Sequence, residues 1–233
     1  MLRAVFLFLF IAIAFAIPIA LFHPESPLPD EWHPFEPLAV SDPVTPLTAW
    51  KLRRTLEDPQ LCLEVLSDAA DFEVLEDQLD GPNCGISPRL KIASVGSSQL
   101  DDLETTCATA LTTALWEHHS LQPRAEEYLG GPISRNAHSG SYSCRMIRTP
   151  SGEGRNWSTH ARALALDVAG FETIDGERLR LLDDWEGSDS RSTYLKAVRD
   201  DACDWFGLTL SPDFNALHAD HFHLQVFGWG GCR

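Results

Sequence analysis

The sequence predicts an α+β fold, with a small antiparallel sheet and flanking helices in a single domain behind an N-terminal apolar segment. Short runs of alternating apolar residues indicate strands, and an Asp-Gly pair between two such runs indicates a β-hairpin. Separate stretches with apolar residues at helical spacing indicate helices. The chain has 233 residues, of which 44% are hydrophobic, so it is long enough to fill one globular core.

The chain begins with an uncharged apolar run from Ala4 to Phe22. At about 1.5 Å per residue, this run reaches roughly 28 Å as a helix, close to the hydrocarbon thickness of a bilayer. Two interpretations stay open: a signal peptide cleaved after the small-x-small sequence Ala14–Ala16, or a retained transmembrane anchor over residues 1–22. The length of the run favours the anchor. Either interpretation places the remaining chain outside the cytoplasm.

Residues 23–48 are rich in proline, and this composition predicts an extended, semi-rigid linker. The folded domain is expected over residues 49–233. Helices are predicted over Thr48–Ala70 with a break or restart at Pro59, over Gln99–His118, where Asp101 and Asp102 suit a helix N-terminus, and over Ser192–Trp205. Strands are predicted over Arg89–Val95, Arg162–Phe171, Arg178–Leu182 and His221–Phe227, with Asp175-Gly176 as the turn between the second and third.

Charge and cysteine content narrow the class of protein. The formal net charge is −16, with 34 acidic against 18 basic residues, so the chain repels phosphate backbones and nucleic acid is not an expected partner. The six cysteines form no CxxC pair, which excludes a thiolate zinc site of the usual spacing. An even count behind an export segment predicts up to three disulfides, whose connectivity the sequence leaves open.

Two segments of the C-terminal half carry metal-ligand residue types, Ser158–Asp167 and His218–His223. On a strand, His221 and His223 share one face while the apolar Phe222 and Leu224 share the other. Asp167 lies on a strand face that is otherwise lined by alanines, which leaves space beside its carboxylate.

A buried carboxylate without a partner is costly, and a dication beside it removes that cost. His160, Asp167 and His223 would give a zinc ion three protein ligands and leave a fourth position open, as in catalytic zinc sites. The joint pattern therefore predicts a zinc site.

The H-x6-D motif followed by D-H-x-H resembles the metallopeptidase group that comprises lysostaphin-type enzymes, D-Ala-D-Ala carboxypeptidases and the hedgehog N-terminal domain. Within this group the chain is most similar to the bacterial extensin-like C-terminal family, over roughly residues 55–233. The resemblance rests on the stretches Gly140–Arg145, Ser158–Ala161, Ala165–Val168, Asp175-Gly176, Asp184-Trp185 and His218–His223, and on the six cysteines.

The resemblance implies a hedgehog or D-Ala-D-Ala peptidase-like fold and a role for each matching residue. His160, Asp167 and His223 match the zinc ligands. Asp220 stands where the carboxypeptidases have a glutamate base, and His221 matches a histidine near the attacking water. Arg145 is expected to steady the substrate carbonyl or carboxylate. Gln225 departs from the aspartate expected there, which predicts a lost hydrogen-bond acceptor behind His223.

The expected function is zinc-dependent hydrolysis of an amide bond in peptidoglycan peptides, by an endopeptidase or carboxypeptidase. In this mechanism Asp220 or His221 takes the proton of the attacking water, and Arg145 stabilises the oxyanion. The expected location is the bacterial periplasm, with the chain anchored in the inner membrane or secreted after signal cleavage. Two alternatives are an inactive zinc-containing wall-binding module and a structural envelope protein whose histidines are incidental.

Overall fold

The computed structural model describes residues 2–22 and 26–233, so the start of the predicted linker, residues 23–25, lies outside the described residues. The α-helices are α1 (Leu2–Phe22), α2 (Thr48–Glu57), α3 (Pro59–Ser67), α4 (Cys107–Trp116), α5 (Gln122–Leu129), α6 (Leu181–Asp184) and α7 (Ser190–Trp205). The strands of the main sheet are β1 (Ala70–Leu75), β4 (Arg89–Val95), β5 (Ser98–Thr105), β6 (Ile133–Gly140), β9 (Ala165–Thr173), β10 (Arg178–Arg180), β11 (Leu208–Leu210), β12 (Phe222–Gln225) and β13 (Gly231–Cys232).

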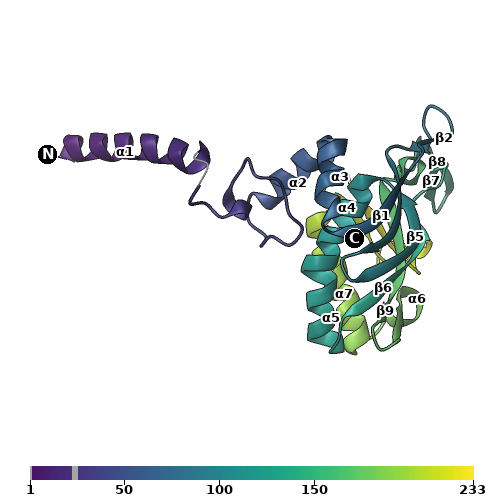
Figure 1. Cartoon of the computed structure of the whole chain (residues 1–233). Coiled ribbons are helices and arrows are strands. Elements are labelled where there is room, and N and C mark those ends of the chain that lie inside the picture. Colours follow the sequence, from purple (N-terminus) through teal and green to yellow (C-terminus); the bar gives the residue numbers. More distant parts are fainter. Residues whose placement is uncertain (1, 23–25) are drawn as a thin grey trace.

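The main sheet is larger than the small sheet that the sequence predicts. Nine strands run in the order β1-β4-β5-β6-β9-β12-β11-β13, with β10 paired to β9. Most neighbours are antiparallel, while β5–β6 and β11–β13 are parallel pairs. The helices α4, α5 and α7 lie together on one side of this sheet (Figure 1). The α+β class is therefore confirmed, and the strands that the sequence did not predict are β1, β5, β6, β11 and β13.

The predicted break at Pro59 is confirmed as a boundary between two helices. Asp58 caps the second helix, α3, because its side chain accepts hydrogen bonds from the backbone N–H groups of Gln60 and Leu61. Pro59 occupies the first helical turn, where its missing N–H has no intrahelical partner to lose. The predicted strand Arg89–Val95 is confirmed as β4.

The predicted helix over Gln99–His118 is wrong in its first third, where the chain forms strand β5. Leu100 and Leu103 of this strand are buried, and Asp101 and Asp102 between them adopt positive φ angles of 44° and 62°. The strand pairing slips at this point, so the two aspartates form a bulge. The bulge changes the spacing of the leucines from two to three, which imitates a helix. The helix itself, α4, begins after Thr106, which caps it.

The C-terminal elements agree with their predictions within a few residues. Strands β9 and β10 form the antiparallel hairpin expected around Asp175-Gly176, and Gly176 has a positive φ of 82°. The predicted helix Ser192–Trp205 is α7, and the predicted strand His221–Phe227 is shortened to β12. Between α4, α7 and the sheet lies a core of aromatic rings in edge contacts, namely Trp116, Phe171, Tyr194 and Phe206.

The proline-rich segment differs from an extended spacer over its second half. Leu38 and Val40 are buried in the core, and a short 3₁₀ helix forms over Asp30–Trp32. The ammonium of Lys51 on α2 is buried and donates to the carbonyl oxygen of Asp30 at 2.6 Å. Residues from about 30 onward are therefore part of the folded domain.

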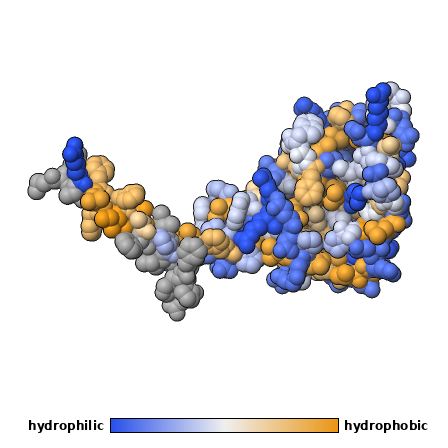
Figure 2. Space-filling view, turned by 90° about the horizontal axis from the view of Figure 1, so that it is seen from above, coloured by the Kyte–Doolittle hydropathy of each residue, from blue (hydrophilic) through white to orange (hydrophobic). Residues whose placement is uncertain are grey.

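Helix α1 projects away from the rest of the chain (Figure 1), and apolar side chains are exposed along it (Figure 2). Among the residues that the structure describes, no helix has the length and apolar character needed to cross a membrane. The membrane anchor stays a prediction.

All six cysteines are paired, which confirms the expectation of three disulfides and supplies their connectivity. Cys62–Cys107 joins α3 to α4, and Cys84–Cys144 joins two loops beside the sheet. Cys203–Cys232 ties α7 to β13 near the C-terminus.

Removing the last disulfide tests how far the C-terminal strand depends on it. The double variant Cys203→Ser/Cys232→Ser opens a loop of 29 residues, and loop entropy predicts a loss of about 3–4 kcal/mol of unfolding free energy. For a chain of this size the melting temperature should fall by roughly 6–16 °C, measured by thermal denaturation followed by circular dichroism. An unchanged melting temperature would show that strand pairing alone holds β13 in place.

Candidate metal centre

Two neighbouring strands of the main sheet present the first two residues of the site. In the antiparallel ladder of β9 and β12, Asp167 lies directly opposite His223. On β12, Phe222 and Leu224 are fully buried, whereas His223 is partly exposed on the opposite face. The predicted division of this strand into an apolar face and an imidazole face is therefore confirmed.

The third residue, His160, comes from a single 3₁₀ turn over Thr159–Arg162 that precedes β9. Ser158 caps this turn by accepting a hydrogen bond from the His160 N–H. The turn ends at Ala163 in the left-handed conformation, with φ of 50°, which redirects the chain into the strand. His160 consequently folds back over the face that carries Asp167, as the sequence predicts.

Buried hydroxyl groups hold the strained residue Ala163 in place. Its carbonyl oxygen accepts a hydrogen bond from Thr109 at 2.8 Å, and from Thr105 and Thr106 at 3.2 Å each. These threonines belong to the end of β5 and the start of α4. The left-handed residue is thus fixed by the core, and it fixes the position of His160.

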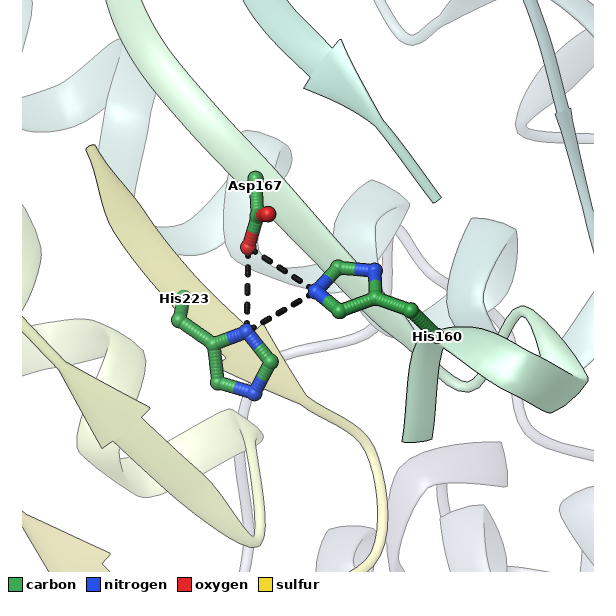
Figure 3. A group of neighbouring side chains, drawn as sticks. All are labelled: His160, Asp167 and His223. Atoms are coloured by element: carbon green, nitrogen blue, oxygen red, sulfur yellow. Dashed lines mark hydrogen bonds and ion pairs between the residues drawn. The ribbon is translucent and has the colours of Figure 1, made fainter. Parts of the chain in front are cut away.

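The three side chains converge on one point (Figure 3). His160 Nε2 lies 3.1 Å from Asp167 Oδ1 and 3.1 Å from His223 Nδ1, and the last two atoms lie 3.0 Å apart. Ligand atoms around a tetrahedral zinc ion, with bonds of about 2.0–2.1 Å, are roughly 3.3 Å apart. The triangle has the dimensions of one face of such a site.

The protonation of His160 favours a cation at this point. Its Nδ1 lies 2.9 Å from the backbone carbonyl oxygen of Ser141, which can only accept a hydrogen bond. Nδ1 therefore carries the proton, and Nε2 of a neutral ring turns a lone pair toward the carboxylate. The lone pairs of His160 Nε2 and Asp167 Oδ1 then face each other and repel. A divalent ion between the two atoms would be coordinated by both and would remove this repulsion.

The charge state of Asp167 suits the same role. Burial opposes its ionisation, but in the metal-free protein the hydrogen bonds and charges that the His160 and His223 rings supply when protonated outweigh burial and lower its pKa well below the ordinary range. The carboxyl group is therefore an anion at neutral pH, as a metal ligand must be. Among the described residues, these three are the only group of His, Cys, Asp or Glu side chains close enough to share a metal ion.

One side of the triangle faces a cavity of about 430 Å³, lined among others by Arg145, Asp167, His218, His221 and His223. His221 Nε2 lies 3.7 Å from Asp167 Oδ1, outside the triangle but beside it. A ligand entering the cavity would meet the open side of the metal site and His221 together.

The two residues that the sequence assigns to proton transfer, Asp220 and His221, differ in their position relative to the cavity. Asp220 is a surface residue, with 66% of its side chain exposed, and does not line the cavity. Its carboxylate lies 2.8 Å from His221 Nδ1. Asp220 thus contacts the site only through His221, whose other nitrogen faces the metal ligands.

Arg145 and Gln225 also lie at the site. Arg145 lines the cavity, where burial is the main cause that lowers its pKa and repulsion from Arg148 adds to it. Gln225 is not placed behind His223: its side-chain oxygen accepts a hydrogen bond from Thr159 at 3.2 Å and so braces the turn of His160. The acceptor that orients a ligand ring is the Ser141 carbonyl instead.

Sequence reasoning missed the position of His218, whose ring packs against those of His221 and His223, with centroids 5.3 and 5.9 Å apart. Its Nδ1 lies 2.9 Å from Asn215 Oδ1. Burial, followed by the charges of His221 and His223, lowers the pKa of His218 to about 4, so its ring is neutral at neutral pH. The three-residue spacing to His221 is the one signal that points to this contact. The Ser141 carbonyl has no sequence signal, because it is a backbone group.

Comparison with known proteins agrees with the resemblance seen in the sequence. No curated protein and no solved structure matches the chain. A family model described as extensin-like protein C-terminus matches residues 60–233, which include all three residues of the triangle and the whole cavity lining. The chain therefore belongs to the extensin-like C-terminal family.

Proposed function

We propose that this chain is a zinc-dependent hydrolase of amide bonds in peptidoglycan peptides of the bacterial cell envelope. The observation that carries the proposal is the triangle of His160 Nε2, Asp167 Oδ1 and His223 Nδ1, which opens on one side to a cavity that His221 also lines. A structural zinc site is normally closed by a fourth protein ligand, whereas a catalytic site keeps one position open.

His160, Asp167 and His223 would hold the ion. Bound zinc supplies a water molecule acidic enough to attack near neutral pH, and it polarises the carbonyl group under attack. The remaining chemistry falls to side chains of the chain itself.

His221 is the proton acceptor in this proposal, with Asp220 as the residue that orients it. The Asp220 carboxylate on Nδ1 holds the proton there, so Nε2 offers its lone pair toward the cavity. This Nε2 is the free imidazole nitrogen beside Asp167, and it would take the proton of the attacking water and deliver it to the leaving amine. Arg145, also in the cavity, would stabilise negative charge on the carbonyl oxygen.

The disulfides and the family resemblance support the substrate class. Three disulfides indicate an oxidising compartment, as expected of an exported domain. The resemblance to wall-cleaving metallopeptidases extends from the metal ligands to His221, and the wall lies outside the inner membrane. An inactive wall-binding module would not require a histidine poised beside the open face.

Metal binding is tested by purifying the full chain, removing metal and adding Zn²⁺. We expect one zinc per chain for the parent and none for Asp167→Ala or His223→Ala, measured by elemental analysis after gel filtration. Zinc at a hundredfold excess over its dissociation constant should stabilise the parent by about 2.7 kcal/mol, or roughly 5–11 °C in melting temperature. His118→Ala, which changes an exposed histidine, is the matched control. Equal zinc content in all four proteins would contradict the site.

Catalysis is tested by digesting purified peptidoglycan and separating the released fragments by chromatography. His221→Ala should retain zinc and lose about 10²–10⁴-fold in rate, because it removes the proton acceptor. Asp220→Ala should lose less, roughly 10–100-fold, because it removes only the orienting partner. If the parent, Asp220→Ala and His221→Ala release the same fragments at the same rate, or release none, hydrolysis at this site is wrong.

A further inference from the structure

One wall of the cavity comes from a hairpin that stands outside the main sheet. Strands β7 (Met146–Thr149) and β8 (Gly152–Trp157) pair only with each other. The cavity is lined from this side by residues 145 and 147–150. With Arg145 just before it, the hairpin carries three arginines (Arg145, Arg148, Arg155) and one acidic residue, Glu153, in a chain whose net charge is −16.

These three arginines differ from most others in the domain. Seven arginines elsewhere form ion pairs with carboxylates, namely Arg89, Arg124, Arg135, Arg178, Arg180, Arg191 and Arg199. Within residues 2–22 and 26–233, none of the three hairpin arginines does so; Arg145 donates instead to the carbonyl oxygen of Met146. The described residues therefore give the hairpin arginines no carboxylate in an ion pair, although the chain has 34 acidic residues.

Two of the hairpin arginines, Arg145 and Arg148, line the cavity, and Arg148 is the less compensated of the two. Glu153 lies directly opposite it in the hairpin ladder, yet the two side chains form no ion pair within the described residues, and Arg148 lines the cavity instead. The charge of Arg145 is partly offset by attraction to Asp167. Arg145 and Arg148 repel each other, so an anion between Arg148 and the cavity interior would relieve this repulsion.

The surroundings of Arg148 favour a peptide over a small inorganic ion. Ile147 on the hairpin and Phe214 and Leu217 on the opposite wall line the same cavity, and each keeps at least 40% of its surface exposed. Such apolar walls bind aliphatic side chains and strengthen a nearby charge-assisted hydrogen bond by excluding water.

We propose that Arg148 is a specificity residue that anchors a free carboxylate of the substrate at the hairpin end of the cavity, away from the bond that is cut. The substrate class is then an anionic peptide, bound with its carboxylate on the Arg148 guanidinium and its scissile amide at the metal site. The identity of the peptide rests on the proposed function, whereas the carboxylate subsite stands on the hairpin itself.

The test measures binding of two probes to the full zinc-loaded chain carrying His221→Ala, which blocks turnover. One probe is a peptidoglycan stem tetrapeptide with its free carboxylates; the other is the same peptide with every carboxyl converted to a carboxamide. Isothermal titration calorimetry should show roughly tenfold tighter binding of the acid form. Arg148→Gln should abolish this preference, and Arg148→Lys should retain part of it.

Arg155→Gln is the matched control, because Arg155 lies on the same hairpin, is exposed and does not line the cavity. It should keep the full preference for the acid probe. The proposal is wrong if the preference for the acid probe survives Arg148→Gln, or if Arg155→Gln removes that preference equally. It is also wrong if neither probe binds. Hydrolysis is measured separately with the chain that retains His221. A carboxylate preference without cleavage supports the Arg148 subsite and contradicts the proposed hydrolase. Cleavage without a carboxylate preference supports the hydrolase and contradicts the subsite.

Discussion

The candidate metal centre depends on the register between β9 and β12. Asp167 and His223 are 56 residues apart in the chain and meet because they are opposite each other in one antiparallel ladder. A slip of one residue would turn the imidazole into the core and bring Leu224 or Phe222 out to the cavity. The buried apolar face of β12 therefore fixes the chemistry of its other face: hydrophobic burial of Phe222 and Leu224 specifies where the ligand nitrogen lies.

The position of His160, the third candidate ligand, is fixed by a turn outside the ladder of β9 and β12. His160 sits on a turn that ends in the left-handed Ala163, whose carbonyl is held by hydroxyl groups at the start of α4. That end of α4 is tied to α3 through Cys62–Cys107. His160 is thus braced by the core and by a covalent link, whether or not a metal is bound. Such preorganisation reduces the entropy that binding must otherwise overcome.

Sequence reasoning succeeds where residue type and strand alternation coincide. Asp167 and His223 could be chosen because each lies on the strand face opposite an apolar one, and His160 because it lies just before the strand that carries Asp167. It fails where the spacing itself is altered: the bulge at Asp101 and Asp102 converts strand spacing into apparent helix spacing. The sequence also does not predict that Asp220 contacts His221 and lies away from the cavity. Residue order alone does not fix the direction of a side chain in a loop. The Ser141 carbonyl carries no residue-type signal at all.

The charge distribution links the site to the rest of the molecule. The chain has a formal net charge of −16, and seven arginines outside the β7–β8 hairpin form ion pairs with carboxylates. A dication at the triangle would add to the positive charge of Arg145 and Arg148, which line the same cavity. Because positive charge gathers in this cavity, an acidic surface and an anionic substrate are compatible. The surface charge then favours solubility while the cavity alone selects what is bound.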